Sequence, residues 1–325
     1  MAPELTVIVV SFDTRDLTLA CLASIFEQTR RTTFEVIVVD NASSDGSAQA
    51  IAACFPGVRL IASPENLGFA RANNLAARSA RGRRLLLLNP DTVVIDAGID
   101  RLVDFARARP RARIWGGRTV FADGSLNPAS CWMAQSIWSC LCCASGLSSI
   151  FRRSSLFNPE GIGGWDRTGE RRVDIVSGCF LLIDADLWNE LSGFDPAFFM
   201  YGEEADLCLR AAARGARPCV TGDATVIHLG GASERVRADK MVRLLRAKIE
   251  LIRRHFPRRQ RALGVWLLSL WPLSRAVAWC AMGLLGVRAA DDAGSVWREV
   301  WARRGEWRAG YSGDGGSLAA ERAAA

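Results

Sequence analysis

The N-terminal part of the chain alternates between short apolar runs and longer segments whose apolar residues recur at helical spacing. Apolar runs of about four to eight residues that end in turn signals are typical of buried strands. Such runs occupy Leu5–Phe12, Phe34–Ser43, Val58–Ser63 and Arg84–Asp91. Strands that alternate with helices in this way form a parallel sheet with right-handed crossovers, so we expect an α/β fold.

Polar side chains follow these strands at the points where the strands end. They are Ser11, Asp13, Asp40, Asn41, Asn66, Asn89 and Asp91. Because the carboxyl ends of parallel strands share one edge, we expect these groups to meet in a crevice, where a nucleotide is the default ligand. A Rossmann dehydrogenase is excluded, because the first turn, VVSFDTRD, lacks the Gly-x-Gly-x-x-Gly of dinucleotide-binding folds. No phosphate loop with a lysine is present either.

The cysteines and histidines of the 325 residues form no metal-binding or disulfide pattern. Ten cysteines lie at irregular spacings, and the two histidines are His228 and His255. Neither a zinc site nor a disulfide framework is therefore predicted, and a reducing cytosol suits the chain. The N-terminal residues MAPELTVIVVSF lead directly into a strand pattern, so we expect no signal peptide.

Positive charge is concentrated in one segment. Glu234 to Arg261 holds eleven Lys and Arg against three acidic residues, a balance of +8 in a chain whose net charge is +7. Nucleic acid could bind such a segment. However, Ala262 to Val287 follows it with three tryptophans and the single charge of Arg275. Basic residues beside a tryptophan-rich apolar stretch are typical of contact with anionic lipid headgroups, so we expect a membrane surface and no nucleic acid.

Several motifs, in order, identify a family. The stretches VIVVSFDTRDLTLACLASI, VIVVDNASSDGS, NLGFARANN and LLLNPDT are followed by VSGCFLLIDADLWNELSGFDPAFFMYGEEADLCLRAAARG and ATVIHLGGAS. Together they resemble the inverting nucleotide-sugar glycosyltransferases of the GT-A fold, family 2, and within it the bacterial rhamnosyltransferase-like members. The resemblance implies a Rossmann-like mixed sheet flanked by helices, with a catalytic domain over residues 1–233.

The resemblance also implies how the donor is held. Asp40 matches the carboxylate that hydrogen-bonds the nucleobase, and Ser11 lies on the loop that lines the base. Arg71 matches the position that reaches the nucleotide or its phosphates. The further residues expected to bind the nucleotide-sugar are Asp13, Asn41, Asn66, Asn89, Gly230 and Gly231. The two glycines would let backbone amides approach the diphosphate closely.

The sequence NPD resembles the family's Asp-x-Asp metal motif, with Asn89 in place of the first carboxylate. Asp91 and His228 are the implied ligands of Mg²⁺ or Mn²⁺, and an imidazole among oxygen ligands suits Mn²⁺. The metal would bridge the diphosphate and act as a Lewis acid on the leaving group. An amide is a weaker, uncharged ligand, so we expect Asn89 to bind a ribose or sugar hydroxyl and metal affinity without substrate to be low.

The catalytic base is expected in YGEEADLCLRAAARG. By composition alone, its acidic residues could simply favour a helix N-terminus. The family's acidic pair falls on Glu203 and Glu204, and its second member removes the proton of the acceptor hydroxyl. Many relatives carry Asp there, so the longer arm of Glu204 leaves open which of the two reaches. Asp206 and Arg210, four residues apart, form a structural pair in this interpretation.

The expected activity is transfer of one sugar with inversion, from a donor such as dTDP-L-rhamnose to a lipid-linked or polysaccharide acceptor of the cell envelope. The alternatives are the same fold with a UDP- or GDP-hexose donor, or an inactive nucleotide-sugar binding protein. An inactive binding protein would be expected to lack the acidic helix start. The Trp-bearing segment Asn127 to Arg153 could be an acceptor lid or core packing, and the sequence does not discriminate.

The C-terminal part is expected to be a helical, membrane-associating appendage over residues 234–290, followed by a partly disordered tail over 291–325. Arg237 to Arg254 carries one apolar helical stripe. Pro272 and Arg275 interrupt the apolar segment 262–287, which could form two interfacial helices, pack within the protein or span the bilayer. We expect a cytoplasmic protein bound peripherally to the inner face of the plasma membrane.

Overall fold

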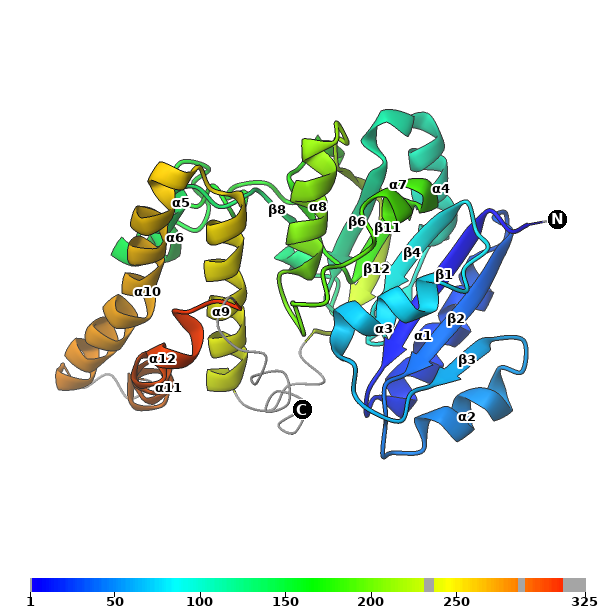
Figure 1. Cartoon of the computed structure of the whole chain (residues 1–325), viewed down its shortest axis with the longest axis horizontal. Coiled ribbons are helices and arrows are strands. Elements are labelled where there is room, and N and C mark those ends of the chain that lie inside the picture. Colours follow the sequence, from blue (N-terminus) through cyan, green and yellow to red (C-terminus); the bar gives the residue numbers. More distant parts are fainter. Residues whose placement is uncertain (1, 231–236, 286–289, 312–325) are drawn as a thin grey trace. The chain divides into compact units, whose positions relative to one another are not determined.

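The computed structural model describes residues 2–230, 237–285 and 290–311 (Figure 1). Its first part follows the predicted alternation of strands and helices. In chain order the elements are β1 (Leu5–Ser11), α1 (Arg15–Gln28), β2 (Phe34–Asp40), α2 (Ser47–Cys54), β3 (Arg59–Ala62), α3 (Gly68–Ala77), β4 (Arg84–Leu88), β5 (Thr92–Val94) and α4 (Gly98–Ala108). The predicted α/β class, a mixed sheet flanked by helices, is confirmed.

The next strands complete the main sheet and form a second, two-stranded sheet. They are β6 (Ile114–Val120), β7 (Leu126–Asn127), β8 (Cys131–Trp132), β9 (Glu170–Arg172), β10 (Ile175–Val176), β11 (Phe180–Asp184) and β12 (Cys219–His228). Between β11 and β12 lie α7 (Ala185–Glu190) and α8 (Glu203–Ala213). The strand order of the main sheet is β3-β2-β1-β4-β11-β6-β12-β5, and β8 and β10 pair separately.

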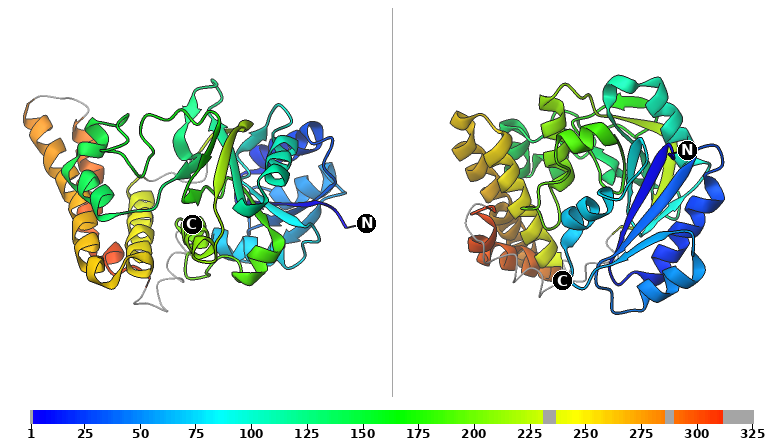
Figure 2. Two further views of the ribbon diagram at one scale, coloured as in Figure 1. Left: turned by 90° about the horizontal axis from the view of Figure 1, so that it is seen from above. Right: turned by 45° about the vertical axis from the view of Figure 1, so that its right-hand side comes forward.

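The order of the strands reverses between β1 and β4. The chain winds outward from β1 through β2 to β3 and then returns to place β4 on the other side of β1, all in parallel. A right-handed connection from β3 to β4 places α3 on the face of the sheet opposite α1 and α2, and α1 and α2 contact each other (Figure 2). Ligands bind outside the carboxyl ends of the strands at such a switch point.

The central strands are buried because both faces of the sheet are covered. The side chains of Leu85 to Leu88 are almost completely buried, as the run of four leucines predicts. β11 then pairs antiparallel with β4, and β12 pairs antiparallel with β5 so that His228 lies opposite Thr92. This pairing brings the end of β12 to the turn after β4.

The chain divides into two compact units rather than at residue 233 alone. Of the described residues, one unit holds 2–132 and 166–230, and the other holds 133–165, 237–285 and 290–311. The segment 133–165, which the prediction placed in the catalytic domain, therefore groups with the C-terminal helices. Of the two alternatives for this segment, core packing applies to Cys140, which lies in the core of the second unit.

The second unit consists of helices (Figure 1). They are α5 (Ile137–Ser145), α6 (Leu147–Ile150), α9 (Arg237–His255), α10 (Arg258–Leu284), α11 (Ala290–Ala302) and α12 (Arg304–Trp307). Their core includes Leu245 and Ile249 from the predicted stripe of α9, with Leu267, Val300 and Trp307. Residues 290–302 and 304–307, which the prediction assigned to a partly disordered tail, are helical; residues 312–325 lie outside the described part.

The expected break at Pro272 is absent, because α10 is one continuous helix. Proline inside a helix costs about 3 kcal/mol, but Leu267 and Leu268 are buried in the core, and each such side chain contributes about 1.5 to 3 kcal/mol. In the described part of the chain α10 is the one helix long and apolar enough to cross a membrane. Its most apolar 18 residues have a mean hydropathy of 1.3, and 28% of them are buried. Length and composition alone do not distinguish a span from a helix that lies on a membrane.

Candidate active site

The carboxyl edge of the sheet carries Asp40, at the end of β2. Its side chain is 4% exposed, and Oδ2 accepts a hydrogen bond from the backbone N–H of Ser43 at 3.3 Å. Oδ1 is buried and has no hydrogen-bond partner among the described residues. A buried acceptor without a partner is costly in a folded protein, so Oδ1 of Asp40 is a candidate to accept a hydrogen bond from a ligand.

Ser11 and Asp13 both form hydrogen bonds within the chain. The hydroxyl of Ser11 is fully buried and bonded to those of Thr14, at 3.2 Å, and Thr18, at 2.9 Å. These bonds fix the turn between β1 and α1, while the predicted place of Ser11 on the loop that lines the base stays a prediction. Asp13 Oδ1 accepts from the backbone N–H of Ser44 at 2.7 Å, which positions the loop that follows Asp40.

Asn41 and Asn66 hold the start of α3. The Asn41 amide Nδ2 donates to Asn66 Oδ1 at 2.8 Å, and Asn41 Oδ1 accepts from the backbone N–H of Leu67 at 2.8 Å. Asn66 Oδ1 also accepts from the N–H of Gly68 at 2.9 Å. Arg71 lies one turn further along α3, partly exposed, and its guanidinium has no bond within the described ranges. Two asparagines therefore orient the helix that presents this cation.

Asn89, Asp91 and His228 meet at the turn after β4. His228 Nε2 lies 3.3 Å from Asp91 Oδ1 and 3.5 Å from Asn89 Nδ2. Asp91 Oδ2 accepts a hydrogen bond from the backbone N–H of Gly230 at 3.0 Å, whereas the prediction assigned this amide to the diphosphate. Gly231 lies outside the described residues. The structure thus brings together three of the predicted residues, two from the turn between β4 and β5 and one from the end of β12.

The imidazole of His228 is buried beside this carboxylate. Burial acts to lower its pKa, but the Asp91 carboxylate, with a smaller effect of the nearby Cys179 side chain, outweighs burial and raises the pKa to about 10. His228 Nδ1 has no hydrogen-bond partner in the part of the chain that the structure describes. The neighbouring carboxylate thus favours the protonated form of the imidazole.

The donor set of this turn fits a divalent cation. It comprises an imidazole nitrogen, a carboxylate and, after an amide flip, the oxygen of Asn89, which suits Mn²⁺ or Mg²⁺. The described residues contain no group of three or more His, Cys, Asp or Glu side chains that could hold a metal. An ion held by Asp91 and His228 would therefore need further oxygens from a ligand.

Glu203 and Glu204 form the first turn of α8, after Gly202 at φ 85°. Glu203 is 4% exposed and Glu204 is half-buried; one oxygen of each carboxylate is buried and lacks a partner among the described residues. Burial raises the pKa of Glu203 well above its usual 4.5, and the charge of Glu204 adds to the rise. Burial also raises the pKa of Glu204, although backbone N–H groups at the helix start oppose this. The pair is therefore more basic than an ordinary carboxylate.

Close contacts link this pair to the turn of Asn89 and Asp91, the predicted metal turn. A Cβ at Gly178 would lie 3.9 Å from the Cβ of Glu204 and 3.1 Å from the ring of Phe69. The next carbonyl, that of Cys179, accepts from the N–H of Asn89 at 3.2 Å. Glycine at position 178 thus allows α8 and α3 to approach the segment that contacts Asn89.

Asp206 and Arg210 form the structural pair that their spacing predicts. The guanidinium Nε donates to Asp206 Oδ2 at 2.6 Å. Nη1 and Nη2 donate to the carbonyls of Leu191 and Gly193, so the pair anchors α8 to the preceding loop.

Sequence reasoning missed Asn127 and Cys179. Asn127 Nδ2 donates to the carbonyl of His228 at 3.0 Å and holds the end of β12. Its only signal was an asparagine before a proline, which is common in turns. The contact of Cys179 depends on antiparallel pairing of β11 with β4, which strand patterns do not reveal.

A family model described as "Glycosyl transferase family 2" matches residues 6–172. Among curated proteins, the chain is 28% identical over 225 residues to the N-acetylglucosaminyl-diphospho-decaprenol L-rhamnosyltransferase of Mycobacterium tuberculosis, covering 64% of this chain and 70% of that protein. It is 29% identical over 239 residues to the O-antigen biosynthesis protein RfbC of Myxococcus xanthus, covering 73% of this chain. The chain spans only 18% of the length of RfbC.

Solved structures with similar folds include the mannosyltransferase PcManGT from Pyrobaculum calidifontis in complex with GDP-Man and Mn²⁺. That structure superposes with a TM-score of 0.58 at 18% identity, over 94% of this chain and 88% of its own. GalNAc-T7 with UDP, GalNAc and Mn²⁺ superposes with a TM-score of 0.54 at 15% identity, over 77% and 48%. At these identities the likeness concerns the fold.

Proposed function

The chain belongs to glycosyl transferase family 2, as its ordered motifs predicted, and from that premise we propose that it transfers one sugar with inversion from a nucleotide-diphospho-sugar to an acceptor hydroxyl. The GT-A architecture agrees with its structural neighbours. The observation that carries the proposal is a set of buried polar atoms without partners among the described residues, on Asp40, His228, Glu203 and Glu204. Each belongs to a group that the reaction would use.

Asp40 and Arg71 would bind the donor at the ends of the nucleotide. The unpartnered Oδ1 of Asp40 would accept a hydrogen bond from the nucleobase. Arg71, which Asn41 and Asn66 position through α3, would contact the phosphates, because its guanidinium has no partner in the described chain. The fixed α3 start would reduce the entropy lost when the donor binds.

Asp91 and His228 would hold a Mn²⁺ or Mg²⁺, with Asn89 beside them on the sugar or ribose. When bound, the ion supplies Lewis-acid stabilisation of the diphosphate leaving group. His228 would hold the ion in its neutral form, because only the neutral imidazole binds metal. Gly230 N–H fixes the second oxygen of Asp91 and so sets which oxygen remains available.

Glu204 would remove the proton of the acceptor hydroxyl as that oxygen attacks the anomeric carbon from the face opposite the diphosphate. The pKa of Glu204 is raised by burial, which makes it a stronger base once ionised. The charge of Glu204 raises the pKa of Glu203, so the second carboxylate ionises less readily once the first is charged. Presence of this pair favours an enzyme over an inactive binding protein.

The donor and acceptor are inferred from relatives. The name of the Mycobacterium tuberculosis relative supports an L-rhamnosyl donor, which we take to be dTDP-L-rhamnose, and a lipid-linked diphosphate acceptor. RfbC supports a role in glycan synthesis for the cell envelope. We place the enzyme on the cytoplasmic face of the plasma membrane, held peripherally by its basic and apolar C-terminal helices. A UDP- or GDP-hexose donor remains the alternative that the next experiment distinguishes.

A thermal-shift panel of nucleotide-sugars, each with Mn²⁺, tests the donor. Specific binding stabilises the folded state by about 2.7 kcal/mol at a hundredfold excess over the dissociation constant. We expect dTDP-L-rhamnose to raise Tm more than UDP- or GDP-hexoses. A larger shift with one of the hexose donors would replace the donor, and no shift with any nucleotide-sugar would contradict the function.

Variants of the metal turn test the ligands. Asp91→Ala and His228→Ala should each lose most transferase activity and also the Mn²⁺-dependent part of donor binding, measured by calorimetry with and without the ion. Asp186→Ala, an exposed carboxylate on α7, should change neither. Unchanged metal dependence in Asp91→Ala or His228→Ala would remove that residue from the ligand set.

A further inference from the structure

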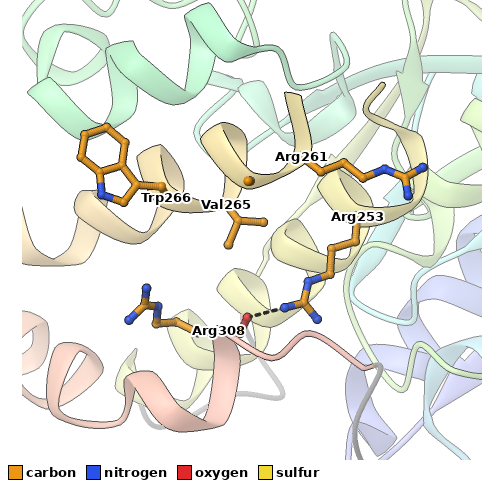
Figure 3. Close-up of a pocket in the computed structure, with 6 residues that line it drawn as sticks. Arg253, Arg261, Val265, Trp266 and Arg308 are labelled. Atoms are coloured by element: carbon orange, nitrogen blue, oxygen red, sulfur yellow. Dashed lines mark hydrogen bonds between the residues drawn. The ribbon is translucent and has the colours of Figure 1, made fainter. Parts of the chain in front are cut away.

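An arginine-lined cavity of about 360 Å³ lies within the second unit (Figure 3). Three different elements contribute its cations: Arg253 from α9, Arg261 from the start of α10 and Arg308 from the residue after α12. Val265 and Trp266 of α10, with Ala262, supply its apolar lining. In Figure 3 the side chain of Val265 points into the space between Arg253 and Arg308.

Backbone carbonyls, rather than carboxylates, hold these arginines in place. Arg253 donates to the carbonyls of Ala309 and, at 3.1 Å, Arg308. Arg261 Nε donates to the carbonyl of Phe256 at 2.9 Å. Within residues 2–230, 237–285 and 290–311 none of the three lining arginines forms an ion pair. Three guanidinium groups around one cavity attract an anion, and their forks match phosphate oxygens.

An apolar stripe on α10 indicates what kind of phosphate this is. Leu263, Trp266, Val277 and Leu284 are 45%, 54%, 60% and 91% exposed. Their separations approximate one, three and two turns of a helix with about 3.6 residues per turn, so they share one face. The stripe includes Trp266, which also lines the cavity. A soluble phosphate would need only the arginines, whereas a lipid offers both a phosphate and hydrocarbon.

The opposite face of α10 is already used. Leu267 and Leu268 lie in the core of the second unit, together with Val300 and Trp307. A helix with one face in a protein core, the other face exposed and apolar, and arginines at one end is suited to lie in a membrane interface, with tryptophan at the level of the headgroups.

We propose that the cavity of Arg253, Arg261 and Arg308 binds the phosphate headgroup of an anionic phospholipid while the stripe of α10 enters the bilayer interface. This assigns a specific lipid site to the membrane association proposed above. It requires neither donor nor catalysis, so a binding assay without nucleotide-sugar tests it independently of the transferase function.

The test is flotation of the full chain with vesicles of phosphatidylglycerol and phosphatidylcholine against vesicles of phosphatidylcholine alone. Binding is expected only with phosphatidylglycerol and should weaken with salt. Arg308→Gln is the sharpest variant, because the Arg308 side chain has no bond in the described chain. Arg259→Gln, an exposed arginine of α10 outside the cavity, removes the same charge and is the matched control.

A diffuse attraction predicts about a fivefold loss of affinity in both Arg308→Gln and Arg259→Gln, since each arginine contributes about 1 kcal/mol near an anionic surface. A specific site predicts that Arg308→Gln and Arg253→Gln lose at least about tenfold more than Arg259→Gln, and that Trp266→Ala also weakens binding. Equal losses in all arginine variants would overturn the site. Full competition by millimolar inorganic phosphate would assign the cavity to a soluble anion, and release only by detergent would instead indicate a span.

Discussion

Glu204 is the residue at which donor binding and turnover should separate. Glu204→Gln keeps the size of the side chain and removes the basic lone pair, and a general base contributes about a hundred- to ten-thousandfold in rate. We expect turnover to fall at least about a hundredfold while the Kd for donor and Mn²⁺, measured by calorimetry, stays the same. Glu203→Gln should be milder. If Glu203→Gln is the more damaging change, the base is Glu203; if the product retains the donor's configuration, neither carboxylate acts as proposed.

The raised pKa values of the same pair predict a pH-dependent cost to stability. The folded state holds the protons of Glu203 and Glu204 more tightly than the unfolded chain, whose glutamates titrate near 4.5. Their contribution to the free energy of unfolding is therefore fully present below pH 4.5 and is lost as the pH rises through the higher pKa of the folded state. Glu203→Gln cannot ionise, so it should match the wild-type Tm at acidic pH and exceed it increasingly toward neutral pH.

The control for this comparison is Glu27→Gln, an exposed glutamate on α1. Thermal unfolding of the three proteins across the acidic to neutral range provides the measurement. A Tm difference for Glu203→Gln that is the same at every pH would show that the carboxylate is not the source of the cost.

At the scale of the element, the start of α3 depends on Gly68. Its φ is +72°, and a Cβ there would lie 2.5 Å from the carbonyl oxygen of Phe199, which also accepts from the N–H of Phe69 at 2.9 Å. Gly46, at the start of α2, has a φ of +81° but nothing within 4 Å of its Cβ position. Left-handed backbone alone costs a non-glycine residue about 1 to 2 kcal/mol.

Gly68→Ala should therefore destabilise the protein by clearly more than Gly46→Ala, for which about 1 kcal/mol is expected. Because α3 carries Arg71, Gly68→Ala should also raise KM for the donor more than it lowers kcat. Urea unfolding and steady-state kinetics of the two variants measure this. Equal destabilisation would mean that the loop at Phe199 yields to the added methyl group.

Elements with a strong period could be predicted from sequence, and their partners could not. The helix predicted from the apolar stripe of Arg237 to Arg254 is α9, Arg237–His255, because the spacing of apolar residues is local information. The antiparallel pairing of β11 with β4 depends on long-range packing, and so does the contact of Cys179 with Asn89. For the same reason Asp91 and His228 could be named from their motifs, while the burial of Ser11 against Thr14 and Thr18 could not. Pro272 misled because a local rule was outweighed by burial.

At the scale of the whole molecule, the second unit requires both of its segments. Deletion of residues 262–325 removes Leu267, Leu268, Val300 and Trp307 from a core that includes Cys140. Each large side chain contributes about 1.5 to 3 kcal/mol, and their sum is comparable to the roughly 5 to 15 kcal/mol that stabilises a domain.

We therefore expect the truncated protein to be cleaved rapidly between residues 133 and 165 in limited proteolysis, followed by mass spectrometry. Leu284→Ser, a change at the exposed end of α10, should leave the cleavage pattern of the full chain intact. Protection of 133–165 in the truncated protein would show that this segment folds without the C-terminal helices.

The assembly of one helical unit from 133–165 and 237–311 also sets an order of events during synthesis. The ribosome releases α5 well before α9 and α10, and at about 5 to 20 residues per second the interval is on the order of seconds. During that time the apolar side of α5, including Cys140, has none of its later neighbours. A nascent chain held at residue 230 should consequently offer this segment to chaperones, and codon changes that slow translation between 166 and 237 should lengthen that exposure and lower the yield of soluble protein.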